Sequence, residues 1–329
     1  MLIDNHGRRI NYLRLAVTDR CNLRCFYCMP EDGLNWLSRS ELMTFEEMLR
    51  SCSLLVKMGI EKIRITGGEP FVRKDIMQLL TALSKLNGLK ELSLTTNGVL
   101  TAPHIPELKK LGIKTINLSL DTLDAGRFFA ITRRDEFAEV MLTLDQLLKH
   151  DIEVKINAVV MGGKNTQDII PLVELTKDTP VSVRFIEEMP FNGDGHKYSG
   201  IQWDHVRILE EIMNKFPATR KLPDPAYSTA YNYQIPGHKG SIGIIAAYSR
   251  TFCGTCNRIR ITPQGELKNC LYDDGVLNIK DMMRNGISDD GLHESLLNAF
   301  SHREKDGWDA ERSRIEKTGV HESMATIGG

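Results

Sequence analysis

Short runs of β-forming residues alternate with helical segments over the first 190 residues. The runs predict strands at 12–17, 62–66, 91–95, 115–120, 153–160 and 181–186. Apolar residues at helical spacing predict helices near 44–58, 75–86, 104–111, 135–149 and 167–177. Repeated βα units imply a parallel sheet. Six of them predict an α/β barrel or partial barrel whose site lies at the carboxyl ends of the strands.

The first of these helices has boundary signals at both ends. Thr44 and Glu47 are spaced as a capping box, and Gly59 provides a stop. Cys52 lies on the apolar side of this helix, so we interpret it as a small core residue.

The pattern changes near residue 200. A helix is expected near 203–215, strands at 231–235, 241–248 and 258–262, and two helical runs after 278. We therefore predict a larger region at 1–200 and a smaller α+β region at 201–329.

Polar residues alternate with apolar ones inside the first set of strands, which places them on one face of the sheet. The polar members are Arg14, Arg64, Asn117, Ser119, Lys155, Asn157 and Arg184. Four cations on the inner face of a barrel indicate an open, polar lumen that binds an anion. The alternative is that they are ordinary solvent-facing strand residues, although parallel strands are usually covered on both faces.

Composition limits the kinds of partner. The 329 residues are 41% hydrophobic and 26% charged with a net charge of −1, which is an ordinary composition for a globular protein. No global basic field favours nucleic-acid binding, so any anion site must be local. No signal peptide and no apolar run of 18 residues is present in the sequence, and we expect a cytoplasmic protein without a membrane partner.

Six of the seven cysteines form two sets of three. Cys21, Cys25 and Cys28 have C-x3-C-x2-C spacing, and three thiolates leave one metal position open. This favours an iron-sulfur cubane whose fourth iron binds another molecule, with a structural zinc knuckle as the alternative. A reducing compartment favours metal ligation over disulfides.

The second set is Cys253, Cys256 and Cys270, again without an evident fourth ligand, although His238 could complete a zinc site. Arg258 and Arg260 lie between the second and third of these cysteines. In an extended segment they point to the same side, where guanidinium groups can bind phosphate or the acceptor edge of a purine. The alternative is that they are solvated strand residues.

The strand at 62–66 is followed by Thr66-Gly67-Gly68-Glu69-Pro70. A glycine pair lets the backbone approach a ligand closely, although alone it could be a simple turn. Together with the first cysteine set it resembles the GGEP motif of radical S-adenosylmethionine (SAM) enzymes. The second cysteine set, the enclosed Asn257-Arg-Ile-Arg260 and the terminal Gly328-Gly329 then resemble the GTP 3',8-cyclase family of molybdenum cofactor biosynthesis.

This resemblance implies a partial (βα)6 TIM-type barrel of the radical SAM type, with a second cluster in the C-terminal region. Two 4Fe-4S clusters would be held by Cys21, Cys25 and Cys28 and by Cys253, Cys256 and Cys270. SAM contacts are expected from Tyr27, Gly68, Ser119 and Met189. GTP contacts are expected from Arg14, Lys62, Arg64, Thr95, Lys155, Arg184, Arg258 and Arg260. Catalytic roles are implied for Arg14, Arg258, Arg260, Gly328 and Gly329, with the terminal glycines reaching into the active site.

The implied reaction is radical cyclisation of GTP to 3',8-cyclo-7,8-dihydro-GTP. Kinship further suggests a homodimer, reduced flavodoxin or a similar electron donor, and handover to cyclic pyranopterin monophosphate synthase. Two alternatives are a radical SAM peptide modifier with auxiliary clusters and a zinc-stabilised binding module.

Overall fold

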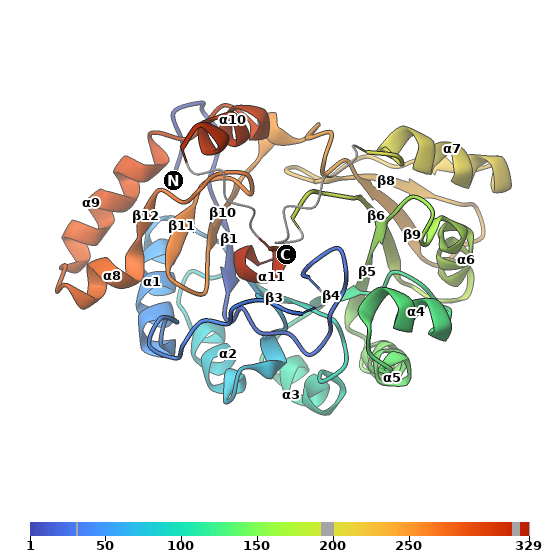
Figure 1. The fold of residues 1–329 in the computed structure, drawn as a ribbon, viewed down its shortest axis with the longest axis horizontal. Coiled ribbons are helices and arrows are strands. Elements are labelled where there is room, and N and C mark those ends of the chain that lie inside the picture. The colour runs from blue at the N-terminus through green and yellow to red at the C-terminus, as the bar shows by residue number, and fades with distance from the viewer. Residues whose placement is uncertain (31, 192–200, 318–322, 329) are drawn as a thin grey trace.

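The computed structural model describes residues 1–30, 32–191, 201–317 and 323–328, which form a curved sheet with helices around its outer side (Figure 1). The described strands form one sheet in the order β12-β11-β10-β1-β2-β3-β4-β5-β6-β9-β8-β7. The two ends of this order do not pair, so the barrel is partial. The strands are β1 (Tyr12–Ala16), β2 (Lys62–Thr66), β3 (Glu91–Thr96), β4 (Thr115–Ser119), β5 (Glu153–Val160), β6 (Ser182–Glu187), β7 (Arg220–Lys221), β8 (Ala230–Gln234), β9 (Ser241–Ile245), β10 (Arg258–Ile261), β11 (Glu266–Lys268) and β12 (Leu277–Asn278).

The helices predicted before residue 216 are present at nearly the predicted bounds, whereas the described residues after 278 form four helices where two helical runs were expected. The α-helices are α1 (Phe45–Met58), α2 (Ile76–Ser84), α3 (Ile105–Lys110), α4 (Ala125–Thr132), α5 (Phe137–Lys149), α6 (Ile169–Asp178), α7 (His205–Lys215), α8 (Ile279–Arg284), α9 (Asp289–Phe300), α10 (Gly307–Lys317) and α11 (Met324–Ile327). Thr44 and Glu47 form both bonds of the capping box on α1, and Gly59 ends that helix with φ 124°. Cys52 is fully buried, as its position on the apolar face predicts.

The central parallel strands contribute alternate side chains to a core between the sheet and the outer helices. Buried residues such as Leu13, Ile63 and Val183 alternate with polar ones that face the concave side. This arrangement confirms the prediction of repeated βα units and leaves the concave side of the sheet for the site.

Residues after 200 extend the same sheet at both edges. β9 pairs in parallel with β6, and β10 pairs in parallel with β1, so that Arg14 lies in register with both Arg64 and Arg260. The strands of the predicted smaller region therefore flank the six βα strands. This register places Arg260 beside Arg14 of β1 and Arg258 beside Tyr12.

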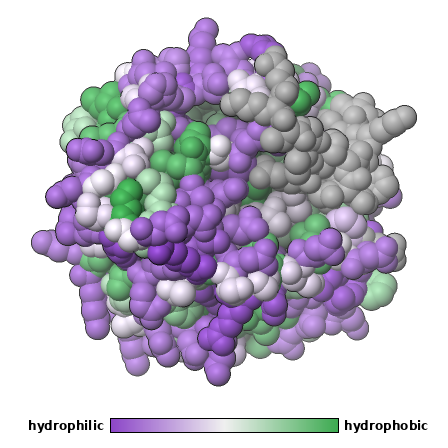
Figure 2. Space-filling view, turned by 60° about the vertical axis from the view of Figure 1, so that its left-hand side comes forward, coloured by the Kyte–Doolittle hydropathy of each residue, from purple (hydrophilic) through white to green (hydrophobic). Residues whose placement is uncertain are grey.

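Helix α4 and the short strands β7, β11 and β12 were not predicted from the sequence. Each is short, and the three strands have two or three residues each, too few for a recognisable period. The face seen in Figure 2 is mainly hydrophilic, with hydrophobic residues in small groups. In the described part of the chain, no helix has the length and apolar character needed to cross a membrane.

Candidate active site

The concave side of the sheet contains two adjoining pockets. One is lined by the first cysteine set and the glycine pair, and the other by the second cysteine set and strand arginines. The residues that line both pockets are Thr95, Asn157, Ile186, Met189 and Met324. The pockets enclose about 1200 and 1070 Å³ including space open to solvent. They therefore form one cavity with three thiols at each end.

The first cysteine set lies on one loop directly after β1. Its backbone turns tightly, since the Cys28 amide donates to the Cys25 carbonyl at 2.9 Å. All three thiols line the same pocket, where a cubane bound at three corners would face the cavity.

The glycine pair after β2 holds this loop in place through its backbone. The Gly68 amide donates to the Thr18 carbonyl at 2.8 Å, and the Glu69 amide donates to the Arg20 carbonyl at 2.8 Å. A Cβ atom at Gly68 would overlap the Arg20 carbonyl oxygen. Only glycine permits this approach, so the pair is more than a simple turn.

Glu69 is fully buried and ties the carboxyl ends of two strands together. Its carboxylate accepts hydrogen bonds from the Asn97 amide at 2.7 Å and from Thr96 Oγ1 at 2.9 Å. Asn97 Nδ2 in turn lies 3.6 Å from Cys21 Sγ and donates to Asn22 Oδ1 at 2.8 Å. Burial raises the pKa of Glu69 to about 7. Glu69 therefore organises the loop that carries the thiols.

The protonation of the first thiols fits a metal-binding role. Burial, with the nearby Glu69 charge, raises the pKa of Cys21 to about 11. Burial and the neighbouring thiolate and Asp121 charges raise the pKa values of Cys25 and Cys28 above their ordinary value. Bare thiolates are unfavourable here, and iron would supply the missing positive charge. Three thiols on one loop, all lining the same pocket, fit a cluster bound through three cysteines.

The four residues expected to contact SAM all line the pocket of the first cysteine set: Tyr27, Gly68, Ser119 and Met189. Tyr27 donates its phenol proton to Asp121 Oδ2 at 2.8 Å, and Asp121 Oδ1 accepts from the Val159 amide at 2.8 Å. Burial raises the pKa of Asp121 to about 6. The phenol group is therefore held by the end of β4 and its ring lies at the pocket.

The second cysteine set comes from two separate segments. Cys253 and Cys256 lie at a 3-10 turn (Cys253–Thr255) and its end, before β10, and Cys270 follows β11. Burial raises the pKa of Cys270 to about 12. Burial acts in the same direction on Cys256, but the charges of Arg258 and Arg303 outweigh it and lower its pKa to about 6. Cations thus surround this end of the cavity.

The structure brings most of the predicted GTP contacts together in the second pocket: Arg14, Arg64, Thr95, Arg184, Arg258 and Arg260. The Nε atoms of Arg14, Arg64 and Arg184 are buried and have no hydrogen-bond partner among the described residues. Burial and the neighbouring Arg64 and Arg258 charges lower the pKa of Arg14 to about 10. Guanidinium groups whose buried Nε–H donors lack a partner fit an anionic ligand.

Two predicted lysines are placed differently. Lys62 Nζ lies 2.6 Å from Glu91 Oε1, and Lys155 Nζ lies 2.8 Å from Glu153 Oε1. Neither is among the residues that line the pocket. They would have to leave these carboxylates to reach a phosphate.

The C-terminal tail enters the cavity as the short helix α11, near the centre of Figure 1. Ser323 Oγ donates to the Cys28 carbonyl, and Arg260 Nη1 donates to the Gly328 carbonyl. The tail thus touches the loop of the first cysteine set and an arginine of the second pocket. Gly329 lies outside the described residues.

The zinc alternative gains nothing from the geometry. His238 Nδ1 lies 2.8 Å from Thr176 Oγ1, and its ring packs on Phe216, away from the pocket-lining residues. Within the described ranges, no three His, Cys, Asp or Glu side chains are grouped closely enough for one metal ion. A cubane is different, because its thiolates bind separate irons.

Comparisons with known proteins agree with this geometry. Residues 15–176 match the model of the Radical SAM superfamily, and residues 181–308 match that of Molybdenum Cofactor Synthesis C. A GTP 3',8-cyclase of Clostridium perfringens is 39% identical and covers 99% of both chains. The chain belongs to the GTP 3',8-cyclase family.

Other members of this family differ in length. The mitochondrial GTP 3',8-cyclase of Arabidopsis thaliana is 40% identical over all of this chain and 84% of its own. Human molybdenum cofactor biosynthesis protein 1 is 41% identical over 88% of this chain, which spans about half (46%) of that protein. Membership therefore rests on the relatives matched over nearly their whole length.

Solved structures share the fold at low identity. Streptococcus suis SuiB bound to precursor peptide SuiA has a TM-score of 0.65 at 16% identity, covering 94% of this chain and 67% of that one. The structure of anSMEcpe with bound AdoMet has a TM-score of 0.57 at 18% identity, covering 96% and 90%. These likenesses confirm the radical SAM fold. Membership of the GTP 3',8-cyclase family, with the match to the Radical SAM superfamily, supports SAM and 4Fe-4S clusters as the cofactors.

Several residues at the cavity escaped sequence reasoning, among them Arg8, Arg303 and Met324. Asn97 follows β3 directly, a position that predicts proximity to the site. Arg8 and Arg303 are in loops near the two ends of the sequence, where no periodic pattern marks them.

Proposed function

We propose that this chain converts GTP into (8S)-3',8-cyclo-7,8-dihydroguanosine 5'-triphosphate, the first step of molybdenum cofactor biosynthesis. The observation that carries the proposal is the single cavity with a cysteine set at each end and unpaired arginines between them. The end with the first cysteine set suits SAM, and the end with the second set and the arginines suits a nucleoside triphosphate.

The first cysteine set would hold a 4Fe-4S cluster that leaves one iron open for SAM. Tyr27, Gly68, Ser119 and Met189 line that pocket and are the proposed SAM contacts. Bound there, SAM supplies a carbon radical that can remove a hydrogen atom from the substrate. The second cysteine set would hold another 4Fe-4S cluster, which would offer an open iron site to the guanine.

Six pocket-lining residues are the proposed GTP contacts in the geometry described: Arg14, Arg64, Thr95, Arg184, Arg258 and Arg260. Lys62 and Lys155 would join the triphosphate by exchanging their carboxylate partners for phosphate. Guanidinium groups with free Nε–H donors can form charge-assisted bonds to phosphate oxygens.

The chain contributes positioning and shielding to the chemistry. Loss of the ribose C3' hydrogen, closure of a bond from C3' to guanine C8, and addition of one electron and one proton give the product. The arginines fix the triphosphate, and α11 covers the cavity near Arg260 and Cys28. Misplacing the reacting atoms by about an ångström can reduce the rate on the order of a hundredfold. We assign the tail glycines Gly328 and Gly329 to this shielding role.

Several finer assignments belong to the proposal. Reduction requires an electron donor such as reduced flavodoxin, and the product would pass to cyclic pyranopterin monophosphate synthase. A homodimer and a cytoplasmic location are proposed, the latter because free thiols persist in a reducing compartment.

Transfer of deuterium from substrate to cofactor tests the proposal. The chain is reconstituted anaerobically with iron and sulfide, then incubated with SAM, dithionite and GTP deuterated at C3'. We expect deuterium in 5'-deoxyadenosine by mass spectrometry and the cyclic product in equal amount. The Cys270→Ser variant provides the matched control, with intact SAM contacts and no product. SAM cleavage without deuterium transfer from GTP in the unaltered chain would refute GTP as the substrate.

A further inference from the structure

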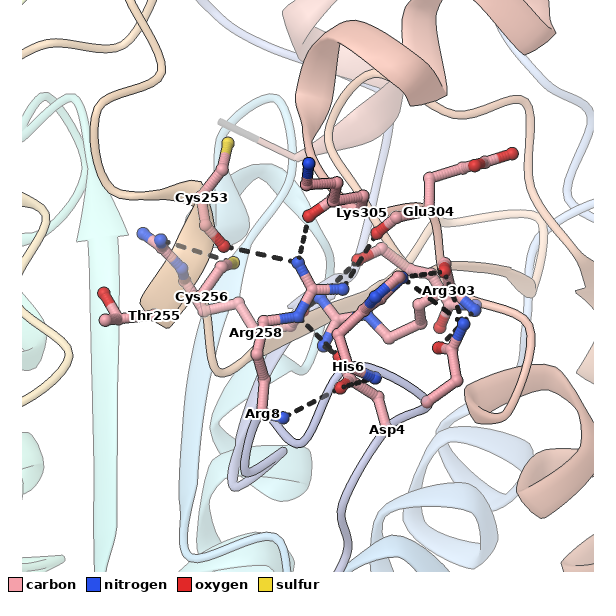
Figure 3. A network of polar contacts seen from close by, with 12 residues as sticks. Asp4, His6, Arg8, Cys253, Thr255, Cys256, Arg258, Arg303, Glu304 and Lys305 are labelled. Carbon is pink, nitrogen blue, oxygen red and sulfur yellow. Dashed lines mark hydrogen bonds and ion pairs between the residues drawn. The ribbon is translucent and has the colours of Figure 1, made fainter.

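A buried carboxylate near the N-terminus lies between two arginines from opposite ends of the chain. Asp4 Oδ2 accepts from Arg8 Nε at 2.7 Å and from Arg303 Nη1 at 3.1 Å. Its other oxygen accepts from the amides of His6 and Arg8, each at 2.9 Å. The Asp4 side chain is 0% exposed, and those of Arg8 and Arg303 are 8% and 3% exposed. Figure 3 shows this network beside Cys253 and Cys256.

Arg8 uses its remaining donors on backbone around the second cysteine set. Its Nη1 donates to the Cys253 carbonyl at 3.3 Å and to the Lys305 carbonyl at 2.7 Å. Its Nη2 donates to the Glu304 carbonyl at 2.8 Å. Arg8 therefore connects a cluster ligand of one segment to the loop before α10.

Arg303 reaches the other segment of the same cysteine set. Its Nη2 donates to the Asn269 carbonyl at 2.9 Å, directly before Cys270, and to the Arg258 carbonyl at 3.1 Å. The two arginines thus hold backbone at Cys253, at Arg258 and beside Cys270. Both also line the second pocket.

The arrangement depends on the guanidinium shape. Each arginine binds Asp4 with one part of the fork and carbonyl oxygens with another, which a lysine ammonium cannot reproduce. Burial acts to raise the pKa of Asp4, but hydrogen bonds from Arg8 and His6 outweigh it and hold that pKa below its ordinary value. The carboxylate therefore stays charged and fixes both forks.

We propose that Asp4, Arg8 and Arg303 are positioning residues for the second cluster and, through Arg258, for GTP. The unit clamps the two separate segments that supply the three thiols. Its described contacts with these segments are hydrogen bonds to backbone carbonyls. The inference rests on the proposed function, because it assigns a task to these residues within the same site.

Variants of Arg303 test the proposal in a full-length chain that carries Cys21→Ser, Cys25→Ser and Cys28→Ser, so that only the second cluster can form. Arg303→Met removes the fork and the charge, and Arg303→Lys removes the fork alone. After anaerobic reconstitution, we measure iron per chain, the EPR spectrum of the reduced cluster with and without GTP, and the dissociation constant for GTP. We expect both variants to show an altered spectrum and about tenfold weaker GTP binding or more.

The matched control is Arg127→Met. Arg127 also pairs with a buried carboxylate, Asp168, at 2.7 and 2.8 Å, but it lines neither pocket. The control should lose stability and keep the cluster spectrum and GTP affinity. Arg8→Lys provides a milder variant if Arg303→Met does not fold, and it should alter the spectrum in the same direction.

Two outcomes would overturn the proposal. One is an unchanged spectrum and GTP affinity in both Arg303 variants, with a loss of melting temperature equal to that of Arg127→Met. The other is full recovery by Arg303→Lys, which would make charge sufficient without the fork. Failure of the proposed function is separate, because it would appear as no deuterium transfer in the unaltered chain, while the spectrum without GTP would still report on the clamp.

Discussion

The two cysteine sets differ in how the chain holds them and in the charges around them. The first set lies on one loop, fixed by the backbone of the glycine pair, and Glu69 and Asp121 lie beside its thiols. The second set is assembled from two segments, held by arginine side chains, and the charges of Arg258 and Arg303 lower the pKa of Cys256 to about 6.

This difference matches the ligands that each end would receive. SAM carries a positive sulfonium group, which is compatible with neighbouring carboxylates. GTP carries several negative charges, which require cations in a partly desolvated cavity. The electrostatics therefore support the proposed arrangement, with SAM at the first set and the triphosphate between the two.

Removal of one ligand from each set should give the largest and most distinct effects. Cys21→Ser should abolish SAM cleavage, because the first cluster loses a ligand. Cys270→Ser should leave SAM cleavage in the absence of GTP and abolish the cyclic product. Each variant should bind about four fewer irons per chain than the unaltered protein. Iron analysis together with 5'-deoxyadenosine yield provides the measurement.

Cys52→Ser is the control for both variants. Cys52 is buried in α1 and lines neither pocket, so iron content and turnover should remain those of the unaltered chain. Equal loss of SAM cleavage in Cys21→Ser and Cys270→Ser would contradict the division of labour between the two sets.

Replacing one glycine at each cysteine set by alanine should distinguish the first set, which is held by close backbone packing, from the second, which is held by arginine side chains. In Gly68→Ala, the new Cβ overlaps the Arg20 carbonyl, which should destabilise the apo protein by about 1–3 kcal/mol and weaken SAM binding. In Gly254→Ala, no atom lies within 4 Å of the new Cβ, and the change should stay within about 0.5 kcal/mol. Denaturant unfolding of both apo variants measures this, and equal destabilisation would contradict the role given to backbone packing.

Substitution of cations at the middle of the cavity should affect binding more than folding. Arg14→Met removes a cation with an unpaired buried Nε, so GTP binding should weaken about 10- to 100-fold. The melting temperature should hold or rise, since a buried charge without a partner is unfavourable. Lys155→Met, whose ammonium already pairs with Glu153, should weaken GTP binding by less than about tenfold. Calorimetry of GTP binding by both reconstituted variants tests this prediction. A larger effect at Lys155 than at Arg14 would contradict the assignment of Arg14 as the stronger GTP contact.

The sequence predicted the parts of the molecule that depend on period and local spacing. Alternation placed Arg14, Arg64 and Arg184 on one face, and the structure shows all three at one pocket. The capping box at Thr44 and the burial of Cys52 follow from helical spacing alone.

Long-range contacts left no such signal. The clamp of Asp4, Arg8 and Arg303 joins residues about 300 positions apart, and nothing in either loop marks the pairing. The pairing of β10 with β1 and of β9 with β6 is likewise set by tertiary packing, so the sequence could not reveal that the later strands flank the earlier ones. The partner of Lys62, Glu91 on the next strand, depends on strand register, which periodicity does not determine. Glu153 lies two residues before Lys155 on the same strand, a spacing that the sequence does show.

The smallest expected effect concerns the polar support of the first set. Tyr27→Phe removes the hydroxyl group that donates to Asp121 at 2.8 Å and keeps the aromatic ring at the pocket. Asp121 retains the Val159 amide as a donor. The free energy of SAM binding should therefore weaken by only about 1 kcal/mol, which is roughly fivefold in affinity. Asp121→Asn and the double variant complete a double-mutant cycle. The effects of the two substitutions on SAM affinity should not add, because both remove the Tyr27–Asp121 hydrogen bond. GTP affinity should remain unchanged in all three, since neither residue lines the second pocket. A loss of GTP binding equal to that of SAM would mean that the two ends of the cavity are coupled through this bond, and the separation on which the comparison rests would fail.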